Sequence, residues 1–492
     1  MGKDVPAIVV SRRDRRAYRE KVRTCLDVLA RMLKESRFDT GAQQVGLEIE
    51  VNLVDSAGCP AMNNSQVLAA IADPVWTPEL GQFNIEFNVP PAMLAGDVFT
   101  ALESTVCGHF ARADTQAQTT GSRLVMVGIL PTLRQSDVGE HAMSDNPRFR
   151  LLNDQILAAR GEEMQIVIEG PERLLAYVDN IAAEAACTSM QCHLQVSPDA
   201  FASYWNAAQI VAGLQVALGA NAPYLFGSEL WRETRITLFG QATDTRPQEL
   251  MSQGVRPRVW FGDRWITSVF DLFEENIRYF PALLPLSEDE DPRLVLERGE
   301  APQLAELTLH NGTVYRWNRP VYAVANGEPH LRVENRVLPA GPTVVDLMAN
   351  AAFYYGLVHE LAEADRPIWS QMSFSAAEAN LMAGARSGLE AELYWPGVGM
   401  VPVAELTLRA MLPMAARGLE RWGVDAADVK RLLSIIEQRC LTGQNGASWQ
   451  VNAVHDLQEG GVTDRCEALR LMTQGYIERM NTNEPVHTWP PM

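Results

Sequence analysis

Lysine is nearly absent from this 492-residue chain. It occurs only at positions 3, 21, 34 and 430, so residues 35–429 contain none. A P-loop and a Schiff-base enzyme both need a lysine, so both are excluded from this central region. Any phosphate bound there must be held by arginine, metal or backbone. A genomic base composition that replaces lysine by arginine would explain the bias equally well, but the exclusion holds whatever its cause.

Other absences narrow the class of protein further. There is no C-x-x-C pair, so neither a disulfide framework nor a zinc knuckle is indicated. No apolar run is long enough to span a bilayer, and the N-terminus lacks the apolar core of a signal peptide, so we expect a cytoplasmic protein without a membrane partner. The net charge of −19 argues against nucleic acid as a partner. The seven cysteines lie at positions 25, 59, 107, 187, 192, 440 and 466.

The hydrophobic content of 47% is that of an ordinary globular protein, and periodicity predicts its elements. Helices are expected over 12–36, 95–118, 147–186 with a break at Gly170-Pro171, 203–220 and 268–284. The pattern is almost continuously helical over 343–481, with breaks at Pro367, Pro396 and Pro413. Strands are expected between 46 and 90 and over 188–197, 234–239, 258–262 and 330–339. Asn311-Gly312 predicts a hairpin, and 287–300 an acidic surface loop.

Four of the expected strands carry an unusual set of polar side chains on one face. Residues two apart share a face of a strand. A solvated face would normally include threonine, serine and lysine, whereas these faces are almost exclusively glutamate, glutamine, asparagine, histidine and arginine. Their members are Glu48, Glu50 and Asn52; Gln82, Asn84, Glu86 and Asn88; Gln191, His193 and Gln195; and His330, Arg332, Glu334 and Arg336.

This pattern predicts a divalent metal site. Glu48 and Glu50 lie roughly 7 Å apart along one strand. Beside Glu86 and Glu334 in a sheet, they would repel strongly without a cation. Hard cations such as Mg²⁺ prefer oxygen ligands, which such a cluster supplies. The arginines that flank Glu334 could each hold a phosphate group through paired hydrogen bonds.

Taken singly, each strand has a simpler explanation. The Glu48/Glu50 pair would be a solvated face, and His193 a core or surface histidine. Arg332 and Arg336 would be surface charges or structural ion pairs. The functional interpretation is favoured because all four strands share the same peculiarity.

The same segments resemble the glutamate–cysteine ligase family of carboxylate–amine ligases. G-L-E-I-E (46–50) resembles its G-x-E-x-E first strand, and E-L-G-Q-F-N-I-E-F-N-V-P-P (79–91) its second acidic strand. M-Q-C-H-L-Q-V (190–196) resembles its Q-x-H-x-x-V strand, and R-V-E-N-R (332–336) its R-x-E-x-R strand. T-G-Q-N-G-A-S-W-Q (442–450) is similar to its late T-G-x-x-x-x-x-x-Q segment. The matches follow the family's order and cover most of the chain.

Pattern and resemblance together predict an α+β fold of the glutamine-synthetase-like catalytic type. We expect a curved, mainly antiparallel sheet with helices on its apolar face and a helical C-terminal region. Residues 1–492 would form a single catalytic domain, with the sheet-bearing core at 40–342 and the helical part at 343–482.

The resemblance also implies an activity and roles for individual residues. It implies a ligase that uses ATP to phosphorylate a carboxylate and lets an amine displace the phosphate, with Mg²⁺ or Mn²⁺ as cofactor. The implied metal ligands are Glu48, Glu50, Glu86 and Glu334, with Glu79, Gln82 and His193 as further ligands or substrate contacts. The implied phosphate- and acid-binding residues are Arg235, Arg332 and Arg336, and the nucleotide contacts Gln82, Asn84, Gln191 and Arg332. Around Arg235 the flanking Q-A-T-D-T-R-P departs from the family's pattern.

The identity of the substrates rests on the resemblance alone. Glutamate is the expected acid and cysteine the expected amine, so the partners would be amino acids and ATP; a homo-oligomer is compatible with the sequence. A ligase for another acid or amine is the close alternative. Two other classes stay open: a metal-dependent hydrolase, which leaves Arg332 and Arg336 unexplained, and a catalytically silent binding protein, against which the intact acidic strands count. The loop 287–300 would be a lid or an ordinary solvated connection.

Overall fold

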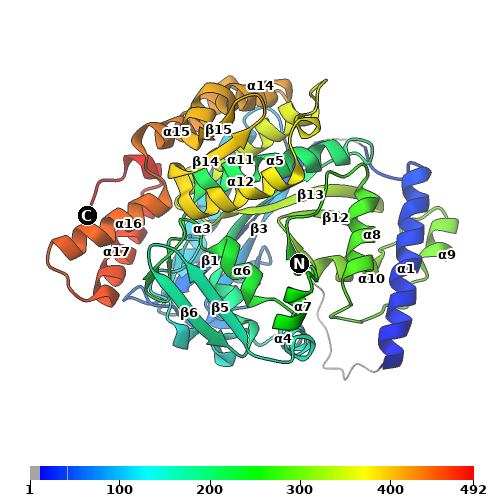
Figure 1. The fold of residues 1–492 in the computed structure, drawn as a ribbon, viewed down its shortest axis with the longest axis horizontal. Helices are drawn as coiled ribbons and strands as arrows, with labels where there is room; N and C mark the ends of the chain where they lie inside the picture. The colour runs from blue at the N-terminus through cyan, green and yellow to red at the C-terminus, as the bar shows by residue number, and fades with distance from the viewer. Residues whose placement is uncertain (1–11, 41–42) are drawn as a thin grey trace.

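A seven-stranded antiparallel sheet forms the centre of the molecule (Figure 1). The computed structural model describes residues 12–40 and 43–492. The strand order is β12-β13-β7-β1-β3-β2, and β4 pairs with β1. The strands of this sheet are β1 (Gln44–Val54), β2 (Trp76–Pro78), β3 (Asn84–Met93), β4 (Arg123–Val125), β7 (Ser189–Gln195), β12 (Asn318–Ala325) and β13 (Glu328–Pro339).

Four strand pairs lie outside the central sheet. They are β5 (Met164–Glu169) with β6 (Arg173–Val178), β8 (Tyr224–Leu225) with β9 (Ser228–Glu229), β10 (Val259–Trp260) with β11 (Tyr315–Arg316), and β14 (Glu392–Trp395) with β15 (Gly399–Pro402). Only the β10–β11 pair among these is parallel in the described ranges.

Helices surround the sheet on several sides. The longer ones are α1 (Arg12–Lys34), α2 (Asn64–Ile71), α3 (Val98–Gln118), α4 (Pro147–Arg160), α5 (Phe201–Gly219), α6 (Arg235–Ala242), α8 (Val269–Tyr279), α10 (Ala305–Gly312), α11 (Val344–Ala362), α12 (Phe374–Ser387), α14 (Leu412–Arg421), α15 (Ala426–Thr442), α16 (Gly446–Glu459) and α17 (Arg465–Met480). The shorter ones are α7 (Gln248–Ser252), α9 (Pro292–Glu297), α13 (Val403–Leu406), η1 (Gln135–Asp137), η2 (Glu140–Ala142), η3 (Ile181–Ala186), η4 (Ile368–Ser370), η5 (Gly388–Glu390), η6 (Thr407–Met411) and η7 (Val486–Thr488).

The apolar face of the sheet packs on α5 and α11, which are buried along nearly their whole length. Helices that are apolar all round are typical of the middle layer of a large core. Tyr355 of α11 ties this layer to the sheet, since its hydroxyl donates to the carbonyls of Gly46 and His193. The polar face is therefore the opposite one, and the helices leave it available for a site.

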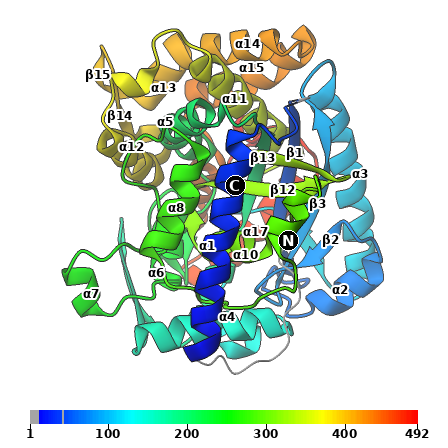
Figure 2. The same cartoon turned by 90° about the vertical axis from the view of Figure 1, so that its right-hand side faces the viewer.

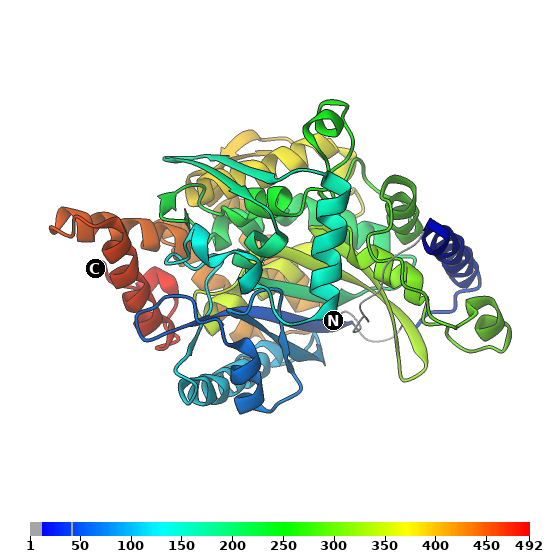
Figure 3. The same cartoon turned by 90° about the horizontal axis from the view of Figure 1, so that it is seen from below.

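Helix α1 and the C-terminal helices lie at opposite ends of the molecule (Figure 1). Helix α1 crosses one end and packs against α8, α9 and α10 (Figure 2). Seen from below, the blue α1 and the red-orange C-terminal helices α16 and α17 lie far apart (Figure 3). No helix within 12–40 and 43–492 is long and apolar enough to cross a membrane.

The fold confirms the predicted class, a curved antiparallel sheet with helices on its apolar face, but two local predictions are wrong. The expected helix over 147–186 ends at Arg160, where Gly161 adopts a left-handed φ of 77°. The β5–β6 hairpin follows, with Gly170-Pro171 in its turn. The expected strand 234–239 is the start of α6, in which Arg235, Leu238, Phe239 and Ala242 are buried at the i, i+3, i+4, i+7 spacing of one helix face.

Three further predictions are wrong. Asn311-Gly312 ends α10 rather than forming a hairpin, and the buried Asn311 side chain donates to the carbonyl of Pro320. The expected loop 287–300 contains the short helix α9, capped by Asp291. The C-terminal region includes the β14–β15 hairpin, and Pro413 lies in the first turn of α14, where it breaks nothing.

Candidate active site

A cavity of about 1380 Å³ lies against the polar face of the sheet. It exceeds the usual size of a single small-molecule pocket, so it has room for more than one ligand. Its walls include strands of the sheet, residues 284–288, and parts of α1, α4 and α10. The charged residues on its sheet side are Glu48, Glu50, Glu79, Glu86, Arg319, Arg332, Glu334 and Arg336.

Three carboxylates converge at one end of the cavity. The antiparallel register of β1 and β3 places Glu50 opposite Glu86, and Glu79 follows β2 on the neighbouring edge. One oxygen from each of Glu50, Glu79 and Glu86 lies within 4.8 Å of the other two. Glu50 and Glu86 are only 9% and 6% exposed, so water screens their charges poorly. We call these three residues the carboxylate cluster.

The electrostatics of the carboxylate cluster fit a divalent cation. Burial and the nearby carboxylates Glu48 and Glu50 raise the pKa of Glu86 to about 7. Burial, together with Glu86 and Glu50, raises the pKa of Glu79 well above its usual range. A bound cation would remove this repulsion, and three carboxylate oxygens are ligands that Mg²⁺ or Mn²⁺ prefers.

Glu48, His193 and Arg332 form a chain beside the carboxylate cluster. Arg332 Nε donates to His193 Nδ1 at 3.0 Å, so the ring proton lies on Nε2, 3.1 Å from Glu48 Oε1. Burial alone would raise the pKa of Glu48, but its hydrogen bond with His193 brings it below its usual value. Nδ1 is thus occupied by Arg332, and Nε2 lies close to Glu48, so His193 would have to move away from one of these neighbours before it could bind a metal.

Glu334 lies between two arginines. Arg319 Nη1 is 3.3 Å from Glu334 Oε1, and Arg336 Nη1 contacts the same oxygen and Gln191 Oε1. Burial would raise the pKa of Glu334, but Arg319 and Arg336 hold it well below its usual range. Its charge is thus already matched, and it fixes two guanidinium groups at the cavity wall.

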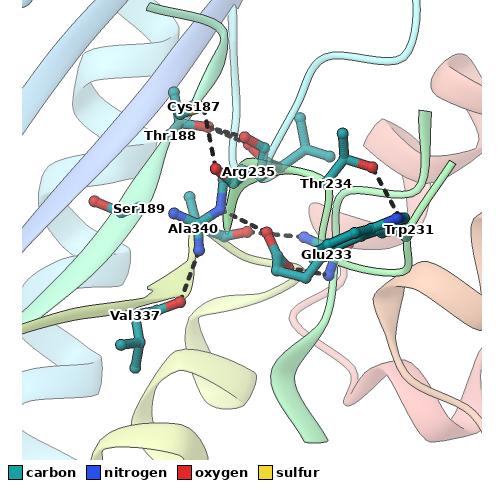
Figure 4. A network of polar contacts seen from close by, with 12 residues as sticks. Cys187, Thr188, Ser189, Trp231, Glu233, Thr234, Arg235, Val337 and Ala340 are labelled. Carbon is teal, nitrogen blue, oxygen red and sulfur yellow. Dashed lines mark hydrogen bonds and ion pairs between the residues drawn. The ribbon is translucent and has the colours of Figure 1, made fainter. Parts of the chain in front are cut away.

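Arg235 is not among the residues that line the cavity. Its side chain is 3% exposed and lies in the buried network of Figure 4, where Nε is 2.6 Å from Glu233 Oε1. Its Nη2 donates to the carbonyl of Val337 at 2.8 Å, where the β13–β7 register shifts. Arg235 thus supports the backbone of β13 next to Arg336.

The expected nucleotide contacts fall in different places. Gln191 lines the cavity and donates to Glu50 Oε1 at 2.9 Å, and Arg332 lines it as well. Gln82 instead donates to the carbonyls of His141 and Met143, beside a smaller pocket of about 520 Å³. Asn84 is buried and donates to Asn52 Oδ1. The structure does not bring Gln82 or Asn84 into the cavity.

Arg319 and Glu184 are two of the charged residues of the cavity that the sequence analysis does not predict. Arg319 lies on β12 (Asn318–Ala325), over which the sequence analysis predicts no strand. It pairs with Glu334 through the β12–β13 register. Glu184 lies on η3, in the segment I-A-A-E-A-A, where a lone carboxylate among apolar residues was an available signal.

An antiparallel sheet of this shape, with carboxylates and arginines lining a cavity on its polar face, is the fold of the glutamine-synthetase-like carboxylate–amine ligases. The sequence profile described as Glutamate-cysteine ligase family 2 (GCS2) matches residues 44–480. The chain belongs to this family, and it is an ATP-dependent ligase that forms an amide bond.

Two solved structures are similar over most of this chain. One is a glutamate–cysteine ligase from Francisella tularensis in complex with AMP, 12% identical, covering 91% of this chain and 93% of that one with a TM-score of 0.51. The other is a bifunctional glutathione synthetase from Pasteurella multocida, 11% identical, covering 93% of this chain and 55% of that one with a TM-score of 0.50. At these identities the likeness shows the fold. No curated protein sequence matches this chain.

Without divalent metal, we expect the melting temperature to rise as pH falls from about 8.5 to about 6. Burial and neighbouring carboxylates raise the pKa of Glu86 to about 7 and that of Glu184 to about 8, whereas both would titrate near about 4.3 in the unfolded chain. The folded state therefore binds more protons in this window, so the free energy of unfolding falls as pH rises. Thermal unfolding in EDTA at several pH values measures this; a melting temperature that is flat or rises with pH would contradict it.

Proposed function

We propose that this chain uses Mg–ATP to phosphorylate the side-chain carboxylate of glutamate and then joins the resulting acyl phosphate to an amine, with cysteine as the first candidate. The observation that carries the proposal is the carboxylate cluster, in which two buried glutamates and the half-buried Glu79 bring oxygens within 4.8 Å of one another inside a cavity that arginines also line. The family of the chain supports the reaction type, and the pairing of glutamate with cysteine comes from the family's name.

The residues of the cavity suit phosphoryl transfer. This reaction needs in-line positioning and positive charge around the moving phosphoryl group more than covalent help from the protein. When bound by the carboxylate cluster, Mg²⁺ would neutralise and orient phosphate oxygens. Arg336, fixed by Glu334 and Gln191, would hold the transferring phosphate, and Arg332 and Gln191 are proposed as nucleotide contacts.

Burial of the site protects the proposed acyl phosphate intermediate from water. An acyl phosphate must meet the amine before water reaches it, so the reacting groups need a wall that excludes solvent. The sheet residues around the carboxylate cluster are largely buried, and α1, α10 and residues 284–288 line the cavity elsewhere. The main chain of Glu288 donates to the buried Glu306 of α10, which ties this segment to α10.

The test is ADP release from Mg–ATP and glutamate, with and without cysteine and a panel of other amines. ADP release that needs both acid and amine would support the proposal, and the best amine would define the substrate. Metal-dependent turnover of a substrate without ATP would indicate the metal-dependent hydrolase instead. Binding of Mg–ATP without ADP release for any acid–amine pair would indicate a catalytically silent binding protein. Absence of nucleotide binding would refute the proposed phosphorylation of the acid by ATP.

A further inference from the structure

One carboxylate of the cavity has a position that the reaction described above does not use. Glu184 is the only charged residue of η3, a short helix whose other five residues are buried and apolar. Its side chain lines the cavity, near enough to Glu50 and Glu79 to influence both electrostatically.

The helix that carries Glu184 is firmly fixed. Asn180 caps its start by accepting from the amide of Ala182, and the amide of Ile181 donates to Asn153 Oδ1. Ala185 packs so closely on Gly81 that a Cβ atom at Gly81 would lie 2.9 Å from its Cβ. The position of Glu184 in the cavity wall is therefore set by packing and not by a partner of its own.

Glu184 also differs from the other carboxylates of the cavity in having no partner. Within residues 12–40 and 43–492, no hydrogen bond or ion pair reaches its carboxylate, whereas Glu50 accepts from Ser189 and Gln191. Glu184 is half-buried, and a carboxylate removed from water without a donor is costly; burial and Glu50 accordingly raise its pKa to about 8, although the charge of Arg336 acts in the opposite direction. The group is thus an acceptor that lacks its donor.

The missing donor is best supplied by a substrate. The three oxygens that could share a metal come from Glu50, Glu79 and Glu86, and Glu184 is not one of that set. A carboxylate beside a metal site, directed into a cavity, is complementary to a compact cation with several N–H donors. We propose that Glu184 binds the ammonium group of an amino-acid substrate; this inference rests on the proposed ligase function.

That ammonium could belong to either substrate, the α-amino group of the acid or the amino group of the acceptor. The two sources can be separated with substrates that lack the charge. Glutarate is glutamate without its amino group, and hydroxylamine is an acceptor that is uncharged at neutral pH. The four combinations of glutamate or glutarate with cysteine or hydroxylamine form a complete test.

The experiment compares the wild-type chain with Glu184→Gln, which keeps size and removes charge. Glu163→Gln, at an exposed glutamate outside the cavity, is the matched control. For the substrate whose ammonium Glu184 binds, we expect KM to rise about tenfold to a hundredfold, the effect of losing one hydrogen bond to a charged group. The kcat and KM measured with its uncharged counterpart should match the wild type. An equal loss in all four combinations, or no loss in any, would overturn the inference.

Binding without turnover keeps this test independent of the proposed function. Calorimetry with Mg²⁺ and a non-hydrolysable ATP analogue measures the affinity for glutamate against glutarate, and for cysteine against 3-mercaptopropionate. We expect Glu184→Gln to abolish the preference for one ammonium-bearing member of these pairs. If the wild type turns over no pair, the proposed function fails, but the preference can still be measured. If the wild type shows no preference for either ammonium-bearing ligand, the inference itself is wrong.

Discussion

Glu86→Gln is expected to lower kcat for acid- and amine-dependent ADP release by about a thousandfold, because the carboxylate cluster loses one of its charged metal ligands. The change should not unfold the protein. Thr77 and Asn88 both donate to Glu86 Oε1, and the amide oxygen of glutamine can accept the same bonds. Steady-state rates over a range of Mg²⁺ concentrations measure the effect.

The same variant separates a metal site from a structural role. Glutamine removes a charge that the folded protein accommodates poorly, so in EDTA near pH 8 the melting temperature of Glu86→Gln should equal or exceed that of the wild type. Glu140→Gln, at an exposed glutamate on η2, is the control and should change neither property. Wild-type activity in Glu86→Gln would show that the carboxylate cluster does not hold the catalytic metal.

We expect Arg336→Ala to lose activity but keep its stability, and Arg235→Ala to lose stability. Arg336 lies at the cavity wall, and its loss should reduce kcat by about a hundredfold or more with a small change in stability, because Glu334 keeps Arg319 as a partner. Arg235 lies outside the cavity, and its loss leaves the fully buried Glu233 without its counter-charge. That change should cost about 3–5 kcal/mol of unfolding free energy.

Urea unfolding and steady-state kinetics on both variants measure this contrast. Arg336→Lys is the informative control, since lysine keeps the charge but has a single terminal nitrogen, which leaves no second donor for a phosphate oxygen once Glu334 and Gln191 are contacted, so it should recover only part of the activity. If Arg235→Ala were as stable as the wild type but inactive, Arg235 would contact substrate and the arrangement in Figure 4 would not be the working one.

The sequence predicts which side chains share one face of a strand, but it does not predict which residues of the adjacent strand lie beside them. A period of two correctly put Glu48, Glu50 and Glu86 on one face, because alternation is a local property. Which residues meet depends on register, which pairs Glu50 with Glu86 and Glu334 with His193 across strands far apart in sequence. The charge balance of Glu334 also depends on Arg319, whose approach no local pattern reveals.

The predicted residues that lie outside the cavity show the limits of local sequence patterns. Gln82 precedes the start of β3 at Asn84, so the alternation that put it on the polar face does not extend to it. The segment T-R-I-T-L-F predicts a strand around Arg235, but the burial of Arg235, Leu238, Phe239 and Ala242 on one face favours the helix α6. The hairpin preference of Asn311-Gly312 is likewise overridden by tertiary contacts, since the buried Asn311 side chain accepts from Asn276 and donates to the carbonyl of Pro320.

The most direct test of the central claim follows the oxygen atoms of the acid. When the side-chain carboxylate of glutamate attacks the terminal phosphorus of ATP, one carboxylate oxygen bridges carbon and phosphorus, and it leaves with phosphate when the amine attacks the acyl carbon. Glutamate labelled with oxygen-18 in its side-chain carboxylate, incubated with Mg–ATP, cysteine and this protein, should therefore yield phosphate that carries one labelled oxygen per molecule. Phosphate released without label would contradict the account, because the acid would not have been activated by phosphorylation.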